Sequence, residues 1–140
     1  MIFSVEKDKA VILIQKELPL GLAINTAAVI GASLGDKVPE ILGEDLKTQD
    51  DKTIAGIVKT PLPILAVDAQ SLKTLLKKLS EDEEIDLIPF SELAQSCRSY
   101  EEYEQKLAEV NLSEINLSGL GVIGPKKKVN KYCGSFPLYK

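Results

Sequence analysis

The chain has 140 residues, of which 44% are hydrophobic and 27% are charged, and its formal net charge is −4. This length is typical of a single globular domain over residues 1–140, with a core that needs no metal, disulfide or cofactor to hold it together. The sequence contains no histidine, which excludes Ser-His-Asp and Cys-His catalytic sites and every histidine-containing zinc site. We therefore expect no metal and no cofactor.

The first apolar segment, residues 10–14, lies between charged residues and is rich in β-branched side chains. It predicts a central strand covered on both faces. It is too short for a signal-peptide core, so we expect a cytoplasmic protein. The next segment, residues 18–35, carries no charge. Its apolar residues recur at helical spacing after Pro19, which predicts a helix that ends near Gly35 and is buried on nearly all sides.

Helices and strands alternate along the rest of the chain. Asp68, Ser91 and Ser99 each stand where a helix N-cap is expected, and Pro89 is expected to end a strand. The alternation predicts an α/β fold of three layers, with a mixed β-sheet and helices on both faces. Residues 36–51 are expected to be irregular, with a helical turn near residues 39–42. The expected strands are residues 54–58, 62–67, 85–88 and 117–123, and the expected helices are residues 70–79, 91–97, 99–110 and 125–132.

Two short patterns could indicate ligand binding. Gly119, Gly121 and Gly124 match the letters of the dinucleotide-binding G-x-G-x-x-G motif, but they lie within an expected strand rather than after one, so we interpret the match as accidental. Cys97 and Cys133 lie far apart and match no metal-ligand spacing. We expect both to be ordinary thiols in a reducing compartment.

The C-terminal segment is basic. From Pro125 onward the chain has five lysines and no acidic residue, whereas the preceding part carries a net charge of −9. A solvated helix face explains these lysines better than a nucleic-acid surface, because the segment has no arginine for phosphate contacts and aromatic residues for base stacking are scarce. Weak, salt-dependent nucleic-acid binding stays open as the alternative. It would use Lys126, Lys127, Lys128 and Lys131.

Four stretches spread over the whole chain resemble the type 2 peptidyl-tRNA hydrolase fold. They are residues 10–28, residues 59–65, residues 93–96 and residues 121–134. The similarity is greatest to relatives of that fold that are known only as domains of unknown function and lack the hydrolase chemistry. The resemblance implies a single domain of this fold. Because proteins of the fold often self-associate, it also implies a homodimer as one candidate assembly.

The hydrolase signature is not retained. In the resembling enzymes the first strand leads into a pattern like D-L-x-M-G-x-G-K-x-A-A-Q-x-x-H, and here its lysine, glutamine and histidine correspond to Ile24, Ala28 and Gly31. In a later D-A-G-x-T-Q loop only Gln95 matches, with Ala94 in place of the threonine. Ile24 cannot place a cation and Gly31 cannot relay a proton, so the electrostatic and acid–base parts of catalysis are both missing. We therefore predict no catalytic residue.

The leading functional interpretation is a non-catalytic binding or regulatory domain. It would bind a small ligand or a protein partner near the start of the first helix. The alternative is a hydrolase of peptidyl-tRNA or a related ester that uses replacement residues. A lysine and a carboxylate hydrogen-bonded in a concave pocket would favour the enzyme, and an apolar or shallow surface would favour the binding domain. The residues expected to gather at the pocket are Glu17, Asn25, Lys59, Ser91 and Gln95.

Three of these five residues also have a purely structural interpretation. Asn25 and Ser91 could satisfy backbone groups, and Lys59 could be solvated. Their arrangement in space is what discriminates between the two interpretations.

Overall fold

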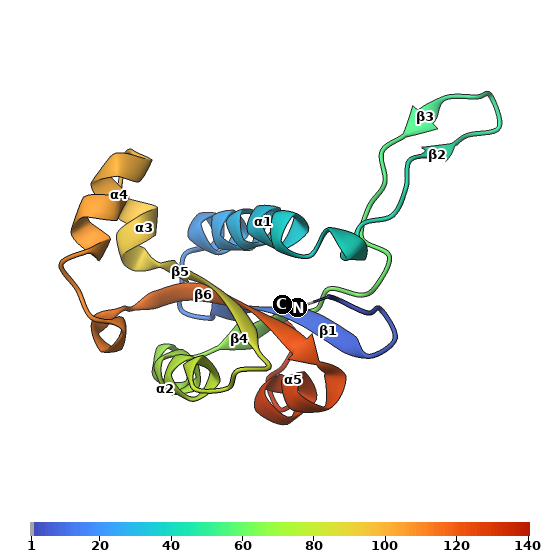
Figure 1. The fold of residues 1–140 in the computed structure, drawn as a ribbon. Coiled ribbons are helices and arrows are strands. Elements are labelled where there is room, and N and C mark those ends of the chain that lie inside the picture. Colours follow the sequence, from blue (N-terminus) through green and yellow to red (C-terminus); the bar gives the residue numbers. More distant parts are fainter. Residues whose placement is uncertain (1) are drawn as a thin grey trace.

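The first apolar segment lies at the centre of a four-stranded mixed sheet. A computed structural model describes residues 2–140, and its sheet has the strand order β4-β1-β6-β5 (Figure 1). Strand β1 (Asp8–Gln15) pairs in parallel with β4 (Ile64–Val67) and antiparallel with β6 (Leu117–Pro125), which in turn pairs antiparallel with β5 (Asp86–Ser91). The predictions of a central first strand and a mixed sheet are confirmed.

Helices cover both faces of this sheet, as predicted. Helix α1 (Leu20–Lys37) lies on one face, and α2 (Ala69–Ser80) and α5 (Lys126–Cys133) lie on the other (Figure 1). The Asp68 side chain caps α2 by accepting a hydrogen bond from the Ser71 amide at 3.0 Å. The shorter elements are α3 (Glu92–Ser96), α4 (Tyr100–Leu107) and the 3-10 turns η1 (Pro39–Ile41) and η2 (Leu112–Glu114).

Strand β1 has core on both sides because successive side chains of a strand point to opposite faces. Ile12 and Ile14 pack with Ile30 of α1. Val11 and Leu13 belong to the core on the other face, which includes buried leucines of α2. The continuous apolar sequence of β1 is therefore explained by burial on both faces.

Glycines in β6 bring α1 close to the sheet. A Cβ atom on Gly119 would lie 2.5 Å from the Thr26 Cγ2 atom and 2.7 Å from the Leu13 carbonyl oxygen, and a Cβ on Gly121 would lie 2.9 Å from the Ile30 Cγ2 atom. Only glycine fits such an approach. The G-x-G-x-x-G letters thus lie within a strand, as predicted, and two of the three glycines permit packing of the helix.

Some element boundaries differ from the sequence-based expectation. Strand β5 runs through Pro89 rather than ending there, because β5 is an edge strand and one side of an edge strand needs no backbone N–H for pairing. Residues 54–58 do not form a strand; only Thr53–Ile54 is assigned to β3. Helix α4 ends at Leu107 instead of near residue 110.

Residues 36–51, which were expected to be irregular, are largely so, but they contribute one short strand to a two-stranded arm. Its strands β2 (Leu46–Lys47) and β3 (Thr53–Ile54) pair antiparallel and extend away from the body, on the α1 side of the sheet (Figure 1). The helical turn predicted near residues 39–42 is present as η1, at the base of this arm.

The prediction that α1 is buried on nearly all sides is wrong. One stripe of the helix packs on the sheet, formed by Ala23, Thr26, Ile30 and Leu34. On the opposite side Leu20 is 68% exposed and Ile24 is 61% exposed.

Within residues 2–140, no helix is both long enough and apolar enough to cross a membrane.

Candidate functional site

Gln95 links three elements near the start of α1. The Gln95 Nε2 atom donates to the Leu22 carbonyl oxygen at 3.0 Å, the Thr26 Oγ1 atom at 3.2 Å and the Asn25 Oδ1 atom at 3.3 Å. Its Oε1 atom accepts from the Ser118 hydroxyl of β6 at 2.8 Å. We call Asn25, Thr26, Gln95 and Ser118 the Gln95 cluster. Both ends of the Gln95 amide are occupied by protein groups, so the cluster joins α1, α3 and β6.

The other three residues expected at this pocket have separate places. Ser91 is buried and caps α3, where its hydroxyl accepts from the Ala94 amide at 3.1 Å. Glu17 lies exposed in the turn between β1 and α1. Lys59 is exposed at the base of the arm, and its backbone amide bonds to the Ile41 carbonyl oxygen, beyond the far end of α1. The structure therefore brings Asn25 and Gln95 together, with Ser91 at the start of the helix that holds Gln95.

Four residues that the expected resemblance matches to the hydrolase signature lie together on the outside of α1. Leu20, Ile24 and Ala28 are spaced by four residues, and Gly31 follows three residues later, so they share one face of the helix. Gly31 has no neighbouring atom within 4 Å of a hypothetical Cβ. We call Leu20, Ile24, Ala28, Gly31 and Ala32 the outer face of α1. This face is solvent-accessible and contains no ionisable group.

A shallow apolar recess adjoins the outer face. It has a volume of about 120 Å³ and lies beside Ile24, between α1 and the sheet edge at Ile64. Its other lining residues are Ile14, Ala23, Ala27 and Tyr139. Apolar recesses of this kind hold hydrocarbon groups more readily than water.

A larger groove lies on the opposite flank of α1. It has a volume of about 450 Å³ and runs between α1, β5 and the pair of helices α3 and α4. Its lining includes Cys97, Tyr100, Tyr103 and Arg98, which is the one arginine of the chain. The two tyrosine rings stack edge to face at a centroid distance of 5.8 Å. The lining is therefore mixed, with one cation, one thiol and two phenols.

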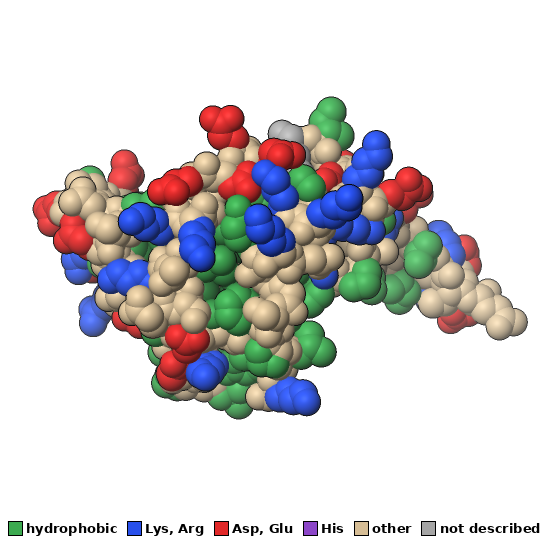
Figure 2. All heavy atoms as spheres, turned by 90° about the horizontal axis from the view of Figure 1, so that it is seen from below, with side chains coloured by type: hydrophobic (Ala, Val, Ile, Leu, Met, Phe, Trp, Pro, Cys, Tyr) green, Lys and Arg blue, Asp and Glu red, His purple; other side chains and the backbone are tan. Residues whose placement is uncertain are grey.

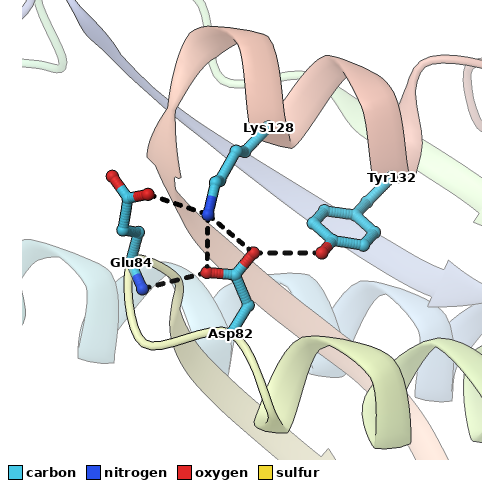
Figure 3. A network of polar contacts seen from close by, with 4 residues as sticks. All are labelled: Asp82, Glu84, Lys128 and Tyr132. Atoms are coloured by element: carbon cyan, nitrogen blue, oxygen red, sulfur yellow. Dashed lines mark hydrogen bonds and ion pairs between the residues drawn. The ribbon is translucent and has the colours of Figure 1, made fainter.

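A lysine and two carboxylates meet in an open hollow elsewhere on the molecule. The Lys128 Nζ atom lies 2.9 Å from the Asp82 Oδ1 atom and 2.8 Å from the Glu84 Oε1 atom, and the Tyr132 hydroxyl donates to Asp82 at 3.0 Å (Figure 3). Hydrogen bonds to Glu84 and Asp82 raise the pKa of Lys128 above its usual range. The hydrogen bond from Lys128 lowers the pKa of Asp82, and the hydrogen bond to Asp82 raises that of Tyr132.

The pKa shifts of Lys128 and Asp82 do not favour either group as a general base near neutral pH. A base must exchange its proton near the operating pH, whereas the pKa of Lys128 moves up and that of Asp82 moves down. The network joins α5 to the loop between α2 and β5, on the far side of the sheet from α1 (Figures 1 and 3). We interpret it as a structural tie between these two segments.

The basic residues of α5 lie on the face that Figure 2 shows, where lysines and acidic side chains are interspersed. Of the four lysines considered for nucleic-acid binding, Lys128 is engaged with Asp82 and Glu84, while Lys126, Lys127 and Lys131 are exposed. Nucleic-acid binding there stays a prediction.

In residues 2–140, no group of three or more Cys, Asp or Glu side chains is arranged to hold a metal ion.

The two cysteines differ in accessibility, which gives a first testable prediction. Cys97 is partly exposed, whereas Cys133 is buried, and burial raises the pKa of the Cys133 thiol to about 11. Because only the thiolate reacts, we expect the native protein to expose one fast thiol to a disulfide reagent. After denaturation we expect two thiols, without any reductant. A Cys97→Ser variant should lose the fast reaction, and finding no titratable thiol in the denatured protein would contradict the expectation of reduced cysteines.

Comparison with known proteins places the chain in a family without assigning an activity. Residues 8–140 match the family described as Protein of unknown function (DUF2000). The chain belongs to this family. The solved structure of a protein of unknown function from Agrobacterium tumefaciens strain C58 is similar, with a TM-score of 0.86 and 16% sequence identity, over 96% of this chain and 98% of that chain. No curated protein matches the chain. This similarity establishes a shared mixed α/β fold.

Sequence reasoning missed several residues of this region. Thr26 and Ser118 are fully buried polar residues of the Gln95 cluster, and Ser118 interrupts an apolar strand, which is the signal that could have indicated a buried hydrogen-bond partner. The outer face of α1 was missed because the uncharged segment was interpreted as buried. Charge-free helices are normally buried, and the sequence alone does not show that one side of this helix is exposed.

Proposed function

We propose that this DUF2000 protein is a non-catalytic binding domain of the type 2 peptidyl-tRNA hydrolase-like fold, and that it binds a protein partner through the outer face of α1. One observation carries the proposal: Ile24, Ala28 and Gly31 lie on an accessible face of α1 that has no ionisable group. The proposed resemblance matches these three residues to the lysine, glutamine and histidine of the hydrolase signature. An accessible apolar surface is typical of protein interaction sites. Such a surface has no means to move a proton or stabilise an oxyanion.

The alternative, a hydrolase with replacement residues, has less support. The lysine–carboxylate arrangement that would favour an enzyme occurs at Lys128 and Asp82, away from α1, and the shifts of their pKa values oppose proton exchange near neutral pH. At the start of α1 the Gln95 Nε2 and Oε1 atoms are both hydrogen-bonded to protein groups. A residue that must polarise a substrate would need free hydrogen-bonding capacity.

A hydrolysis assay tests the proposal. We expect the purified protein to release no tRNA from peptidyl-tRNA under conditions in which a type 2 hydrolase does. The physical reason is that losing a positioned acid–base group or an oxyanion donor costs about two orders of magnitude in rate each. Loss of both leaves little above background.

Two variants make the assay decisive. If turnover is observed and disappears in Gln95→Ala or Lys59→Ala, the binding-domain proposal is wrong and the enzyme alternative holds. Turnover that is identical in both variants and in a mock purification would come from a contaminant, and absence of turnover in all samples supports the proposal.

A further inference from the structure

The groove between α1, β5 and the helices α3 and α4 contains one cation and no carboxylate. Ile88 and Phe90 of β5 form an apolar floor, packed on the α1 side of the sheet, and α3 and α4 lie beside α1 on that side (Figure 1). Arg98 is the only charged residue that lines the groove, and it is exposed. The groove therefore combines an apolar floor with one accessible positive charge.

The Arg98 side chain has no partner within residues 2–140. None of the ion pairs there involves its guanidinium group, and only the Arg98 backbone amide bonds, to the Glu102 Oε2 atom at 3.3 Å. The other oxygen of Glu102 is paired with the Lys106 Nζ atom at 3.0 Å. Both oxygens of this carboxylate are thus engaged elsewhere, and the N–H donors of the guanidinium group are available to an anion.

Tyr100 and Tyr103 add aromatic surface next to this cation. Their rings meet edge to face, with a centroid distance of 5.8 Å and an interplanar angle of 78°. Tyr100 is 80% exposed, so most of its ring is not covered by the chain. Because aromatic rings attract one another in edge-to-face and offset arrangements, this pair offers a surface for a further ring. The groove volume of about 450 Å³ is typical of sites for small organic ligands.

The direction of the backbone groups of β5 follows from the strand register. The N–H and C=O groups of successive residues in a strand point to alternate sides. The Ile12 amide bonds to the segment that leads into β4, so the backbone groups of Leu13 point toward β6, where Leu13 pairs with Leu120. The next residue of β6, Gly121, then points toward β5 and pairs with Ile88. The neighbours of Ile88 in β5 therefore have backbone groups that face away from the sheet.

These neighbours are Leu87 and Pro89, and they make the free edge of β5 a poor template for an added peptide strand. Pro89 has no N–H to donate, and proline on an edge strand opposes pairing. A peptide beside residues 87–89 would find only the Leu87 N–H as a donor. A small molecule held by side chains therefore suits this groove better than an extended peptide.

We propose that the groove is a binding site for a small aromatic monocarboxylate. The Arg98 guanidinium holds the carboxylate through two parallel hydrogen bonds, and the ring lies between the tyrosine pair and Phe90. One guanidinium balances the single charge of a carboxylate, whereas a phosphate dianion would leave a second charge uncompensated beside an apolar floor. The site shares no residue with the outer face of α1, so this inference goes beyond the proposed function and does not depend on it.

Cys97 reports whether the groove is occupied, because it lines the groove and is the more accessible of the two thiols. We expect hydrocinnamate to slow the reaction of Cys97 with dithiodipyridine, an uncharged reagent, in a saturable way. Hydrocinnamamide has nearly the same shape and no charge. It should bind at least about tenfold more weakly, because it cannot form charge-assisted hydrogen bonds. Calorimetric titration measures the same two affinities independently of the thiol.

Substitutions of Arg98 test its role. Arg98→Gln should weaken hydrocinnamate binding by at least about tenfold and leave that of hydrocinnamamide unchanged. Arg98→Lys should retain part of the affinity, because lysine keeps the charge but not the planar fork. Lys73→Gln is the matched control: it removes an exposed cation from a different groove of about 480 Å³ beside α2 and should leave the affinity unchanged. Circular dichroism melts verify that every variant is folded.

Saturable protection of Cys97 that requires the carboxylate and is lost in Arg98→Gln alone supports the inference. It is wrong if hydrocinnamate neither protects Cys97 nor releases or absorbs heat at millimolar concentration, or if the acid and the amide bind equally. An equal loss in Lys73→Gln would mean attraction to positive charge in general. Tighter binding of phenyl phosphate, or of an acetylated tetrapeptide amide with a central glutamate and phenylalanine, would overturn the choice of a small carboxylate. None of these results alters the hydrolysis test of the proposed function.

Discussion

Replacing Leu13 by Asp is expected to unfold the protein. Leu13 is 0% exposed, and in the central strand β1 it lies between Leu65 of β4 and Leu120 of β6. A carboxylate at this position would have no hydrogen-bond donor or cation beside it, and burying an unpaired charge is among the most destabilising single changes. The loss should exceed about 4 kcal/mol, out of a total stability of about 5–15 kcal/mol for a domain. Ile12→Asp should have the same effect on the α1 side of the strand.

Chemical denaturation and thermal melts measure this loss. Leu112→Asp serves as the control, because Leu112 is 48% exposed and a surface substitution usually changes stability by less than about 0.5 kcal/mol. An unchanged melting temperature in Leu13→Asp would mean that β1 is not a central strand. That result would contradict both the sequence pattern and the strand order.

The strands and helices with strong local signals were predictable from the sequence. Residues 10–14 form a continuous apolar run because they are buried on both faces, and Asp68, Ser91 and Ser99 each accept the expected hydrogen bond from a backbone amide. The N-cap signals depend only on neighbours in the chain. They therefore survive in any tertiary context.

What could not be predicted depends on contacts between distant segments. The sequence of an uncharged helix does not show which of its sides are covered by the rest of the domain. The exposure of Leu20 and Ile24 could therefore not be predicted. The pairing of Leu46 with Ile54 involves only two residues on each strand, too few to give an alternating pattern. Pro89 was expected to end a strand, because the sequence does not tell which strand lies at the edge.

Only part of the candidate site was predictable, because its residues come from segments that are distant in the sequence. Asn25 and Gln95 were expected to meet, and they do. Lys59 was placed with them through the similarity of its segment to the hydrolase fold. The structure instead puts it beyond the other end of an 18-residue helix, where its amide bonds to Ile41.

Replacing Gly119 by Ala is expected to destabilise the protein through one methyl group. The new Cβ would lie 2.5 Å from the Thr26 Cγ2 atom and 2.7 Å from the Leu13 carbonyl oxygen, closer than van der Waals contact allows. The carbonyl belongs to the central strand and Thr26 is tied to Gln95 by a 3.2 Å hydrogen bond, so neither neighbour can move freely. Overpacking of this kind costs about 1–3 kcal/mol.

Gly35→Ala is the matched control, since it adds the same methyl group within α1, where the nearest atom is the Leu42 Cδ1 at 3.8 Å. Alanine is favoured over glycine in a helix by roughly 0.5–1 kcal/mol, so this variant should be as stable as the wild type or more stable. The two free energies of unfolding should therefore change in opposite directions. If both variants gained stability, α1 could not approach β6 as closely as the structure places it, and the glycines of this strand would have another role. If Gly119→Ala alone lost stability, these strand glycines would be explained by the packing of the helix that carries the proposed binding face.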